Sequence, residues 1–147
     1  MDFFTSLVYA RNLPLVGRVA YYTLKLLGVE IPRSVRIGER LLLEHGGFGV
    51  VIHSRTVIGD RVKIYPGVTV GRADIYRPME RSRFERVAIE DDVILSPGAK
   101  VLGKDGILKV ARGTVVGANA VLLESTQEGE IWAGIPACCI GKREPGW

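Results

Sequence analysis

A histidine next to a carboxylate is the most chemically suggestive feature of this sequence. Glu44 and His45 are followed by the glycines Gly46, Gly47 and Gly49. Histidine titrates near neutral pH and is the usual general base there, and a neighbouring carboxylate can orient either the imidazole ring or a substrate. Glycines let another backbone or a ligand come close. His45 is therefore a candidate base, although an ordinary histidine at a chain corner fits the same spacing.

The other reactive side chains are few. The second histidine, His53, directly follows an aliphatic residue at a turn position, and we interpret it as structural. The two cysteines, Cys138 and Cys139, are adjacent. Neighbouring cysteines rarely bridge each other, because a disulfide requires Cα atoms about 5.5 Å apart. We expect both to be free thiols, buried near the C-terminal end, in a protein of the reducing cytoplasm.

Length and charge narrow the classes of function. The 147 residues suit one domain, and 20 Lys and Arg against 16 Asp and Glu leave a net charge of +4. Basic blocks interleaved with aromatic residues are absent from the sequence, so no nucleic-acid groove is predicted. The mild excess fits either an anionic small ligand or a solvated surface. We expect no secretory signal, and the apolar stretch 13–27 is too short to span a bilayer comfortably.

An aliphatic residue recurs every six positions through most of the chain, and four positions after most of these lies a second small or aliphatic residue. This period fits neither an amphipathic helix nor long alternating strands. It predicts a mainly β fold, a parallel β-helix of about four to five coils with three short strands per coil, in which neighbouring coils bury each other's aliphatic faces. The repeat positions are Ile31, Ile37, Leu43, Ile52, Ile58, Ile64, Val70, Ile89, Leu95, Val101, Val110, Val116 and Leu122.

Two short helices are predicted before the repeat, over residues 2–11 and 15–27, with Pro14 in the first turn of the second. The second helix has a wide apolar arc beside a narrow basic stripe of Arg18 and Lys25. Such a helix can lie on a membrane surface, but we favour packing on the core or on another subunit.

The segment 72–86 breaks the repeat and carries five arginines. We interpret it as a loop extruded from a corner rather than as a degraded coil, because long loops on rigid scaffolds usually carry function. Its arginines, near Tyr76 and Phe84, suit an anionic acceptor or a phosphate, since guanidinium makes bidentate contacts with such groups. An exposed loop without a partner is the alternative.

The ordered motifs EHGG, YPGVTVGR, GAKVLG, VGANAVL and AGIPA…IGK accompany the repeat. Together they resemble the left-handed β-helix (hexapeptide-repeat) acyltransferases over residues 28–143, and within them serine O-acetyltransferase and its short relatives from polysaccharide gene sets. The resemblance implies a homotrimer with acetyl-CoA lying in the cleft between neighbouring subunits. It also implies that a histidine takes the proton of an acceptor hydroxyl, which attacks the thioester while backbone N–H groups hold the oxyanion. It implies neither a metal nor a covalent intermediate.

The resemblance assigns roles to individual residues. His45 matches the catalytic histidine, Glu44 replaces the aspartate that helps to hold the amino acid, and Gly71 matches a glycine near the thioester. The positions matching the rest of the coenzyme site are Pro97, Ala99, Gly117 and Ala118 along the pantetheine arm, and Ala133, Gly134, Lys142 and Arg143 near the adenine and phosphates. Lys142 and Arg143 fit equally well as solvated tail charges.

The chain also departs from serine acetyltransferases. They carry an Arg-His pair after the extruded loop, where this chain has Glu85 and Arg86. Their large helical N-terminal domain is also missing here. We therefore expect Glu85, Arg86 and Arg72 to contact the acceptor. The departures favour the hydroxyl of a sugar, of a lipid-linked glycan precursor or of another amino acid derivative over serine itself.

Three hypotheses follow. The first is an acetyl-CoA-dependent O-acetyltransferase of cytoplasmic location, built from a helical segment (1–29), a β-helix domain (30–143) and a short tail (144–147). The second, a γ-type carbonic anhydrase, requires three histidines around one zinc, whereas this chain has two. The third is a non-catalytic trimeric scaffold, which the absent second histidine favours and the intact EHGG segment opposes.

Overall fold

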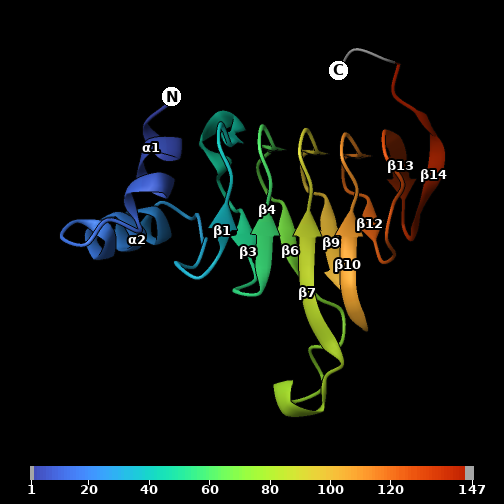
Figure 1. Ribbon diagram of the computed structural model, residues 1–147, viewed down its shortest axis with the longest axis horizontal. Helices are drawn as coiled ribbons and strands as arrows, with labels where there is room; N and C mark the ends of the chain where they lie inside the picture. Colours follow the sequence, from blue (N-terminus) through green and yellow to red (C-terminus); the bar gives the residue numbers. More distant parts are fainter. Residues whose placement is uncertain (1, 145–147) are drawn as a thin grey trace.

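Three β-sheets wrap around one apolar interior, and two helices precede them in the computed structural model, which describes residues 2–144 (Figure 1). We name the sheets in the order in which the chain enters them. Sheet 1 contains β1 (Arg36–Ile37), β4 (Thr56–Ile58), β7 (Phe84–Ile89) and β10 (Gly106–Val110). Sheet 2 contains β2 (Leu42–Leu43), β5 (Lys63–Ile64), β8 (Ile94–Leu95), β11 (Val115–Val116), β13 (Glu130–Gly134) and β14 (Ala137–Lys142). Sheet 3 contains β3 (Val51–Ile52), β6 (Thr69–Arg72), β9 (Lys100–Gly103) and β12 (Val121–Leu122).

Each coil gives one strand to each sheet, so the chain passes sheets 1, 2 and 3 in turn. Neighbouring coils pair in parallel, and β14 alone folds back antiparallel on β13 among the described strands. This confirms the predicted left-handed parallel β-helix, with four three-stranded coils. The three edges of the prism are the 1–2, 2–3 and 3–1 corners, named by the sheets that meet there.

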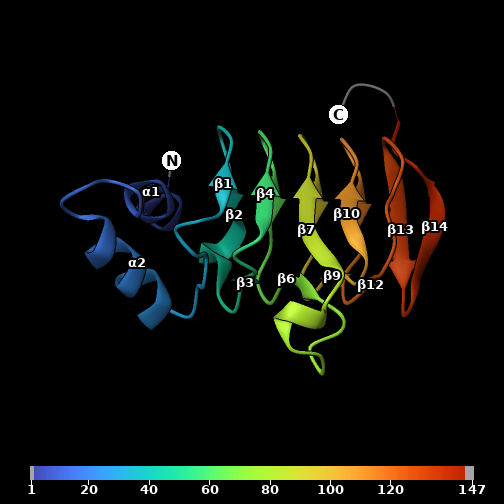
Figure 2. The same ribbon diagram turned by 60° about the horizontal axis from the view of Figure 1, so that its bottom comes forward.

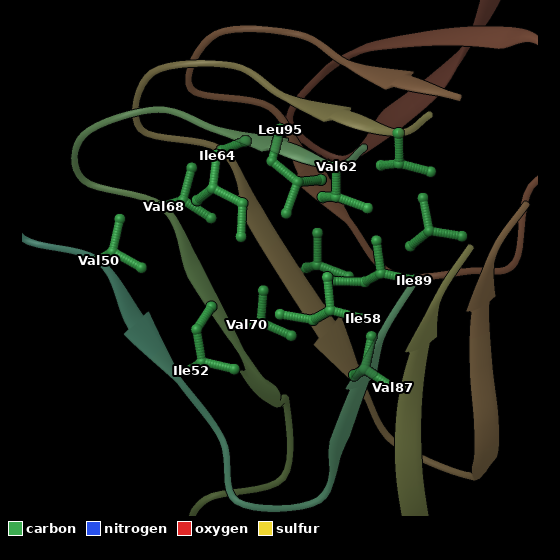
Figure 3. Packing of buried hydrophobic residues seen from close by; sticks show 14 of the residues in the cluster. Val50, Ile52, Ile58, Val62, Ile64, Val68, Val70, Val87, Ile89 and Leu95 are labelled. Carbon is green, nitrogen blue, oxygen red and sulfur yellow. The ribbon is translucent and has the colours of Figure 1, made fainter. Parts of the chain in front are cut away.

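The six-residue repeat forms the core. Of its thirteen aliphatic positions, Ile37 alone is half-buried and the others are buried. Figure 3 shows how equivalent residues of successive coils stack, for example Ile52 on Val70 and Ile64 on Leu95. Since fully burying an aliphatic side chain contributes about 1.5–3 kcal/mol, this column of side chains supplies the main driving force for the stack.

The helices α1 (Phe3–Ala10) and α2 (Gly17–Leu26) lie at the N-terminal end of the prism (Figures 1 and 2). Asp2 caps α1 through the N–H of Thr5 at 2.8 Å. The prediction for the second helix was wrong at its start, because Pro14 lies in the turn before α2 rather than in its first turn. α2 buries Gly17, Ala20 and Leu24.

The opposite face of α2 is apolar and exposed. Leu15, just before the helix, and Leu26, at its end, are 93% and 88% exposed. Val19 and Tyr22 between them complete a stripe that the single chain leaves uncovered. The expected packing of this face on another subunit stays a prediction. No helix among the described residues is long and apolar enough to cross a membrane.

The arginine-rich segment leaves the prism at the 3–1 corner. Residues 73–83, with the short helix η2 (Met79–Arg81), project from the body between β6 and β7 (Figures 1 and 2). The predicted loop is confirmed, except that Arg72 still belongs to β6 and residues 84–86 already belong to β7. At the C-terminal end, Cys138 and Cys139 are free but exposed, so the prediction that they are buried was wrong. Only Ala137 of edge strand β14 is buried, and the residues that follow it in the strand are all exposed. Most of the predicted tail, 145–147, lies outside the described residues.

Candidate active site

His45 lies in a strained turn at the 2–3 corner. The turn η1 (Glu44–Gly47) leaves β2, and His45 and Gly46 have φ values of 51° and 77°. Gly47 continues in the same left-handed region at 64°. A residue with a side chain pays about 1–2 kcal/mol to adopt this conformation. The same conformation occurs at other corners, in Arg40, Arg61, Asp92 and Asn119, so it is a feature of the tight corners of the prism.

Helix α1 supports this turn, a relation that the sequence did not reveal. A Cβ added to Gly46 would lie 2.8 Å from the ring of Phe4. The same ring meets Phe48 edge-on, with centroids 5.2 Å apart. Behind the turn, the N–H of Leu43 donates to the Thr5 hydroxyl at 3.4 Å. The glycine after His45 is therefore required by the close approach of α1.

The two candidate groups of the turn point away from the core. His45 is exposed and Glu44 half-buried, and within residues 2–144 neither side chain has a hydrogen-bond or ion-pair partner. The Tyr65 ring is the aromatic neighbour of His45, at 6.3 Å between centroids. Glu44 thus does not orient the imidazole in the single chain, and its carboxylate is available to a substrate.

The corners that follow His45 stack into one row along the prism. The N–H groups of Gly67, Gly98 and Asn119 donate to the carbonyls of Phe48, Pro66 and Pro97 at 2.8, 2.9 and 2.9 Å. Gly117 continues the row by donating to the Trp132 carbonyl at 2.7 Å. We call this line of stacked turns the corner row. With strands about 4.8 Å apart, three steps span ~14 Å, which suits an elongated ligand.

Several predicted coenzyme residues belong to the corner row. Pro97 and Ala118 are exposed on it, and a Cβ at Gly117 would lie 3.1 Å from the Trp132 carbonyl. Ala133 and Gly134 continue the same side on β13. Lys100 braces the row by donating to the carbonyls of Gly67 and Gly98 at 2.7 and 2.8 Å, which the sequence did not predict.

Three predicted coenzyme residues do not present their side chains on the corner row: Ala99, Arg143 and Lys142. Ala99 is fully buried, so only its backbone borders the row. Arg143 donates to the carbonyls of Asp92 and Gly113 at 3.2 and 3.1 Å, which puts it at the 1–2 corner, across sheet 2 from the row. Burial there lowers the pKa of its guanidinium. Lys142 ends the exposed strand β14.

The remaining predicted residues gather at the 3–1 corner. Gly71 lies in β6, and Glu85 and Arg86 are exposed at the start of β7. Arg72 is turned into the loop instead, where its guanidinium contacts the Asp74 carboxylate at 3.3 Å and the Arg77 carbonyl at 2.7 Å. Because the 3–1 corner and the 2–3 corner are different edges of the prism, one chain does not bring these residues to His45.

The 1–2 corner carries a cavity of about 540 Å³ that the sequence did not predict. The residues that line the cavity include the cationic Arg40, Arg61 and Lys63 and the apolar Leu42. Arg61 forms a bidentate pair with Asp92 at 2.6 and 2.8 Å, and this hydrogen bonding lowers the pKa of the Asp92 carboxyl. The cavity lies across sheet 2 from His45 and is separate from the corner row.

Among the described residues, no cluster of three His, Cys, Asp or Glu side chains is arranged to hold a metal ion.

Proteins of known function are similar to this chain in sequence. No family model matches the chain. A serine acetyltransferase of Staphylococcus aureus (strain Mu50) is 40% identical over 109 residues, which cover 74% of this chain and 47% of that protein. One from Mycobacterium tuberculosis is 33% identical over 139 residues, covering 94% of this chain and 57% of that protein. The chain belongs to the hexapeptide-repeat acyltransferase family. It spans about half the length of the curated relatives it matches.

Solved structures of this family share the fold. A serine acetyltransferase in complex with CoA superposes with a TM-score of 0.69 at 26% identity, covering 93% of this chain and 54% of that chain. The Brucella abortus serine acetyltransferase in complex with coenzyme A gives a TM-score of 0.72 at 26% identity, covering 87% and 49%. A serine O-acetyltransferase from Brucella melitensis gives 0.73 at 28% identity, covering 95% and 54%.

Proposed function

We propose that this hexapeptide-repeat protein is an acetyl-CoA-dependent O-acetyltransferase in which His45 is the general base. The observation that carries the proposal is the corner row, which starts at the exposed, unpartnered His45 and continues along the turns that border the predicted coenzyme site. Relatives named serine acetyltransferase at 33–40% identity, and a neighbour solved with CoA, support this assignment.

The reaction needs one proton acceptor. The His45 imidazole takes the proton of the acceptor hydroxyl as its oxygen attacks the thioester carbon, and returns it to the departing CoA thiolate. Such general-base assistance contributes ~10²–10⁴-fold. An exposed imidazole with no internal partner suits this role, because both ring nitrogens are accessible to substrate.

We further propose that the active site is completed by two chains. His45 lies at the 2–3 corner, whereas Gly71, Glu85 and Arg86 lie at the 3–1 corner of the same prism. A site that uses all four residues requires the 2–3 corner of one chain to face the 3–1 corner of a neighbour. Three prisms side by side meet this requirement in a closed ring.

The acceptor that fits best is a small amino acid with a hydroxyl group, such as serine. Glu44 and Arg86 are both available side chains of opposite charge. Across the cleft between two chains they would hold an ammonium and a carboxylate, since a guanidinium pairs bidentately with carboxylate. A neighbour of the same fold was solved with serine. A sugar hydroxyl is the second candidate, favoured by the replacement of the family's Arg-His pair with Glu85 and Arg86.

The test is release of free thiol from acetyl-CoA with L-serine, and then with a panel of sugars and nucleotide sugars. The variant His45→Asn removes the base while keeping a residue that tolerates the left-handed conformation. We expect turnover to fall by ~10²–10⁴-fold with CoA binding intact. Glu39→Ala, at an exposed position of the 1–2 corner, is the matched control.

The outcomes separate the hypotheses. Serine-dependent release that His45→Asn abolishes supports the proposal as stated, and release with a sugar alone moves the acceptor to glycans. Binding of CoA is measured by thermal stabilisation, since a ligand that binds the folded state raises the melting temperature. CoA binding without turnover on any acceptor favours the non-catalytic scaffold. A chain that CoA does not stabilise would contradict the proposal.

A further inference from the structure

His53 occupies a position that its interpretation as a structural turn residue does not explain. It follows β3, and its N–H donates to the Val70 carbonyl at 2.8 Å, so it lies one position beyond the last registered pair, level with Gly71. The preceding Ile52 faces the core, so alternation directs the His53 side chain outward. His53 therefore lies on the strand next to Gly71, the glycine predicted to meet the thioester, and Gly71 carries no side chain on that outer face.

A backbone hydrogen bond selects one tautomer of the neutral His53 ring. Its Nδ1 accepts a hydrogen bond from the N–H of Arg55 at 3.1 Å, which leaves the proton of the neutral ring on Nε2. Partial burial, and then the charges of Arg55 and Arg72, lower its pKa. The half-buried ring meets the buried Phe84 ring edge-on, with centroids 5.1 Å apart. Among the described residues, none accepts a hydrogen bond from Nε2.

The backbone amide at Gly71 is already used by the sheet. The N–H groups two positions to either side, of Thr69 and Ala73, donate to the Ala99 and Gly103 carbonyls of the next coil at 3.0 and 2.7 Å. In a parallel ladder, N–H groups two residues apart point to the same neighbour. Since Gly71 lies between these two residues and pairs with Leu102, its N–H also points into the ladder. An acyl oxygen beside Gly71 must find a different donor.

We propose that the Nε2–H group of His53 is that donor and stabilises the oxyanion of the acyl-transfer reaction. This inference rests on the proposed function. As the acceptor oxygen bonds to the thioester carbon, the carbonyl electron pair moves onto the acyl oxygen, which accepts the hydrogen bond from His53. The hydroxyl proton goes to His45 of the neighbouring chain. When the carbon–sulfur bond breaks, the electron pair returns to the carbonyl and the thiolate takes the proton from His45.

Two substitutions separate this role from packing. His53→Phe keeps an aromatic ring against Phe84 and removes the donor, so we expect kcat to fall by ~10²–10³-fold with the KM for acetyl-CoA little changed. His53→Gln places an amide N–H at a reach similar to Nε2 and should recover part of the loss. A His53→Phe enzyme with wild-type kcat and an unchanged melting temperature would overturn the proposal.

A binding experiment tests the same atom without turnover. The chain has two histidines, so imidazole resonances in a nitrogen-15 NMR spectrum come from His45 and His53 alone. CoA and acetyl-CoA differ by the acyl group, and we expect the His53 Nε2 resonance to move with acetyl-CoA and much less with CoA. Equal shifts with both ligands would overturn the role of His53 while leaving the proposed function intact. Absence of binding by either ligand would overturn both.

Discussion

At the scale of single residues, the candidate site depends on backbone conformations that few amino acids adopt. His45 is itself left-handed, and Gly46 combines a positive φ with a contact to Phe4 that admits no Cβ. These two requirements explain why glycine directly follows the histidine. They also mean that the position of the imidazole is set by α1, an element forty positions earlier in the chain.

Gly46→Ala should therefore both destabilise the fold and misplace His45. We expect a loss of about 1–2 kcal/mol from the left-handed backbone alone, measured by urea unfolding, with a larger fractional loss in kcat than in CoA binding. Gly141→Ala is the matched control, because a Cβ there meets no atom within 4 Å. Equal behaviour of the two variants would contradict the role assigned to Phe4.

Asp92 links stacked coils by accepting hydrogen bonds from Arg61 and, at 3.4 Å, from Arg112. The Arg61 hydrogen bond lowers the pKa of this carboxyl below its ordinary value. A carboxyl with a lowered folded-state pKa stabilises the protein above its unfolded pKa, and this contribution is lost as pH falls through the folded value. We expect wild type to lose stability below about pH 4, and Asp92→Asn to be less stable at pH 7 with a flatter acid limb. Parallel pH profiles of the two proteins would argue against this link.

At the scale of elements, the helices are tied to the first coil by a buried arginine. Arg11 is 1% exposed, and its guanidinium donates to the carbonyls of Val8 and Val35, the latter at 2.6 Å. Burial lowers its pKa to about 10. Tyr9 adds a second link, donating to the Gly38 carbonyl at 2.7 Å. Because α1 also carries Phe4, this anchoring bears on the site.

Arg11→Met should uncouple the helices from the prism. It leaves the accepting carbonyls buried without donors, for an expected cost of about 2–4 kcal/mol. Hydrogen exchange should increase in α1 and in the His45 turn before it increases in the central coils. Arg18→Met, at an exposed position of α2, is the control. Unchanged exchange in the His45 turn would show that α1 does not hold it.

At the scale of the whole molecule, the prism is a linear stack in which each coil covers the next. Its two functional edges face away from each other, so the proposed site demands neighbouring chains. The exposed stripe of Leu15, Val19, Tyr22 and Leu26 on α2 adds a second apolar surface that the single chain does not cover.

We expect light scattering to give a mass near three times that of the 16.1 kDa chain. Mixing His45→Asn with His53→Phe protein should then restore part of the activity, because mixed assemblies contain some clefts with both intact residues. Homogeneous monomers that remain fully active would contradict the two-chain site. Complementation that fails, with mixed trimers demonstrated, would place both histidines in one chain's site.

The sequence by itself determined the fold, because the six-residue period records directly which side chains face the core, and nearly every repeat position is buried. It also determined the loop, since the period stops there, and it drew attention to His45 through the glycines that follow it.

Tertiary structure alone decided the rest. The support of His45 by Phe4, the alignment of His53 with Gly71 and the position of Arg143 at another corner depend on contacts between residues far apart in the chain. Cys138 and Cys139 are exposed for the same kind of reason, because β14 is an edge strand that no further coil covers. A local period records which face of a strand is buried, but it carries no information on which corner or neighbour a side chain meets.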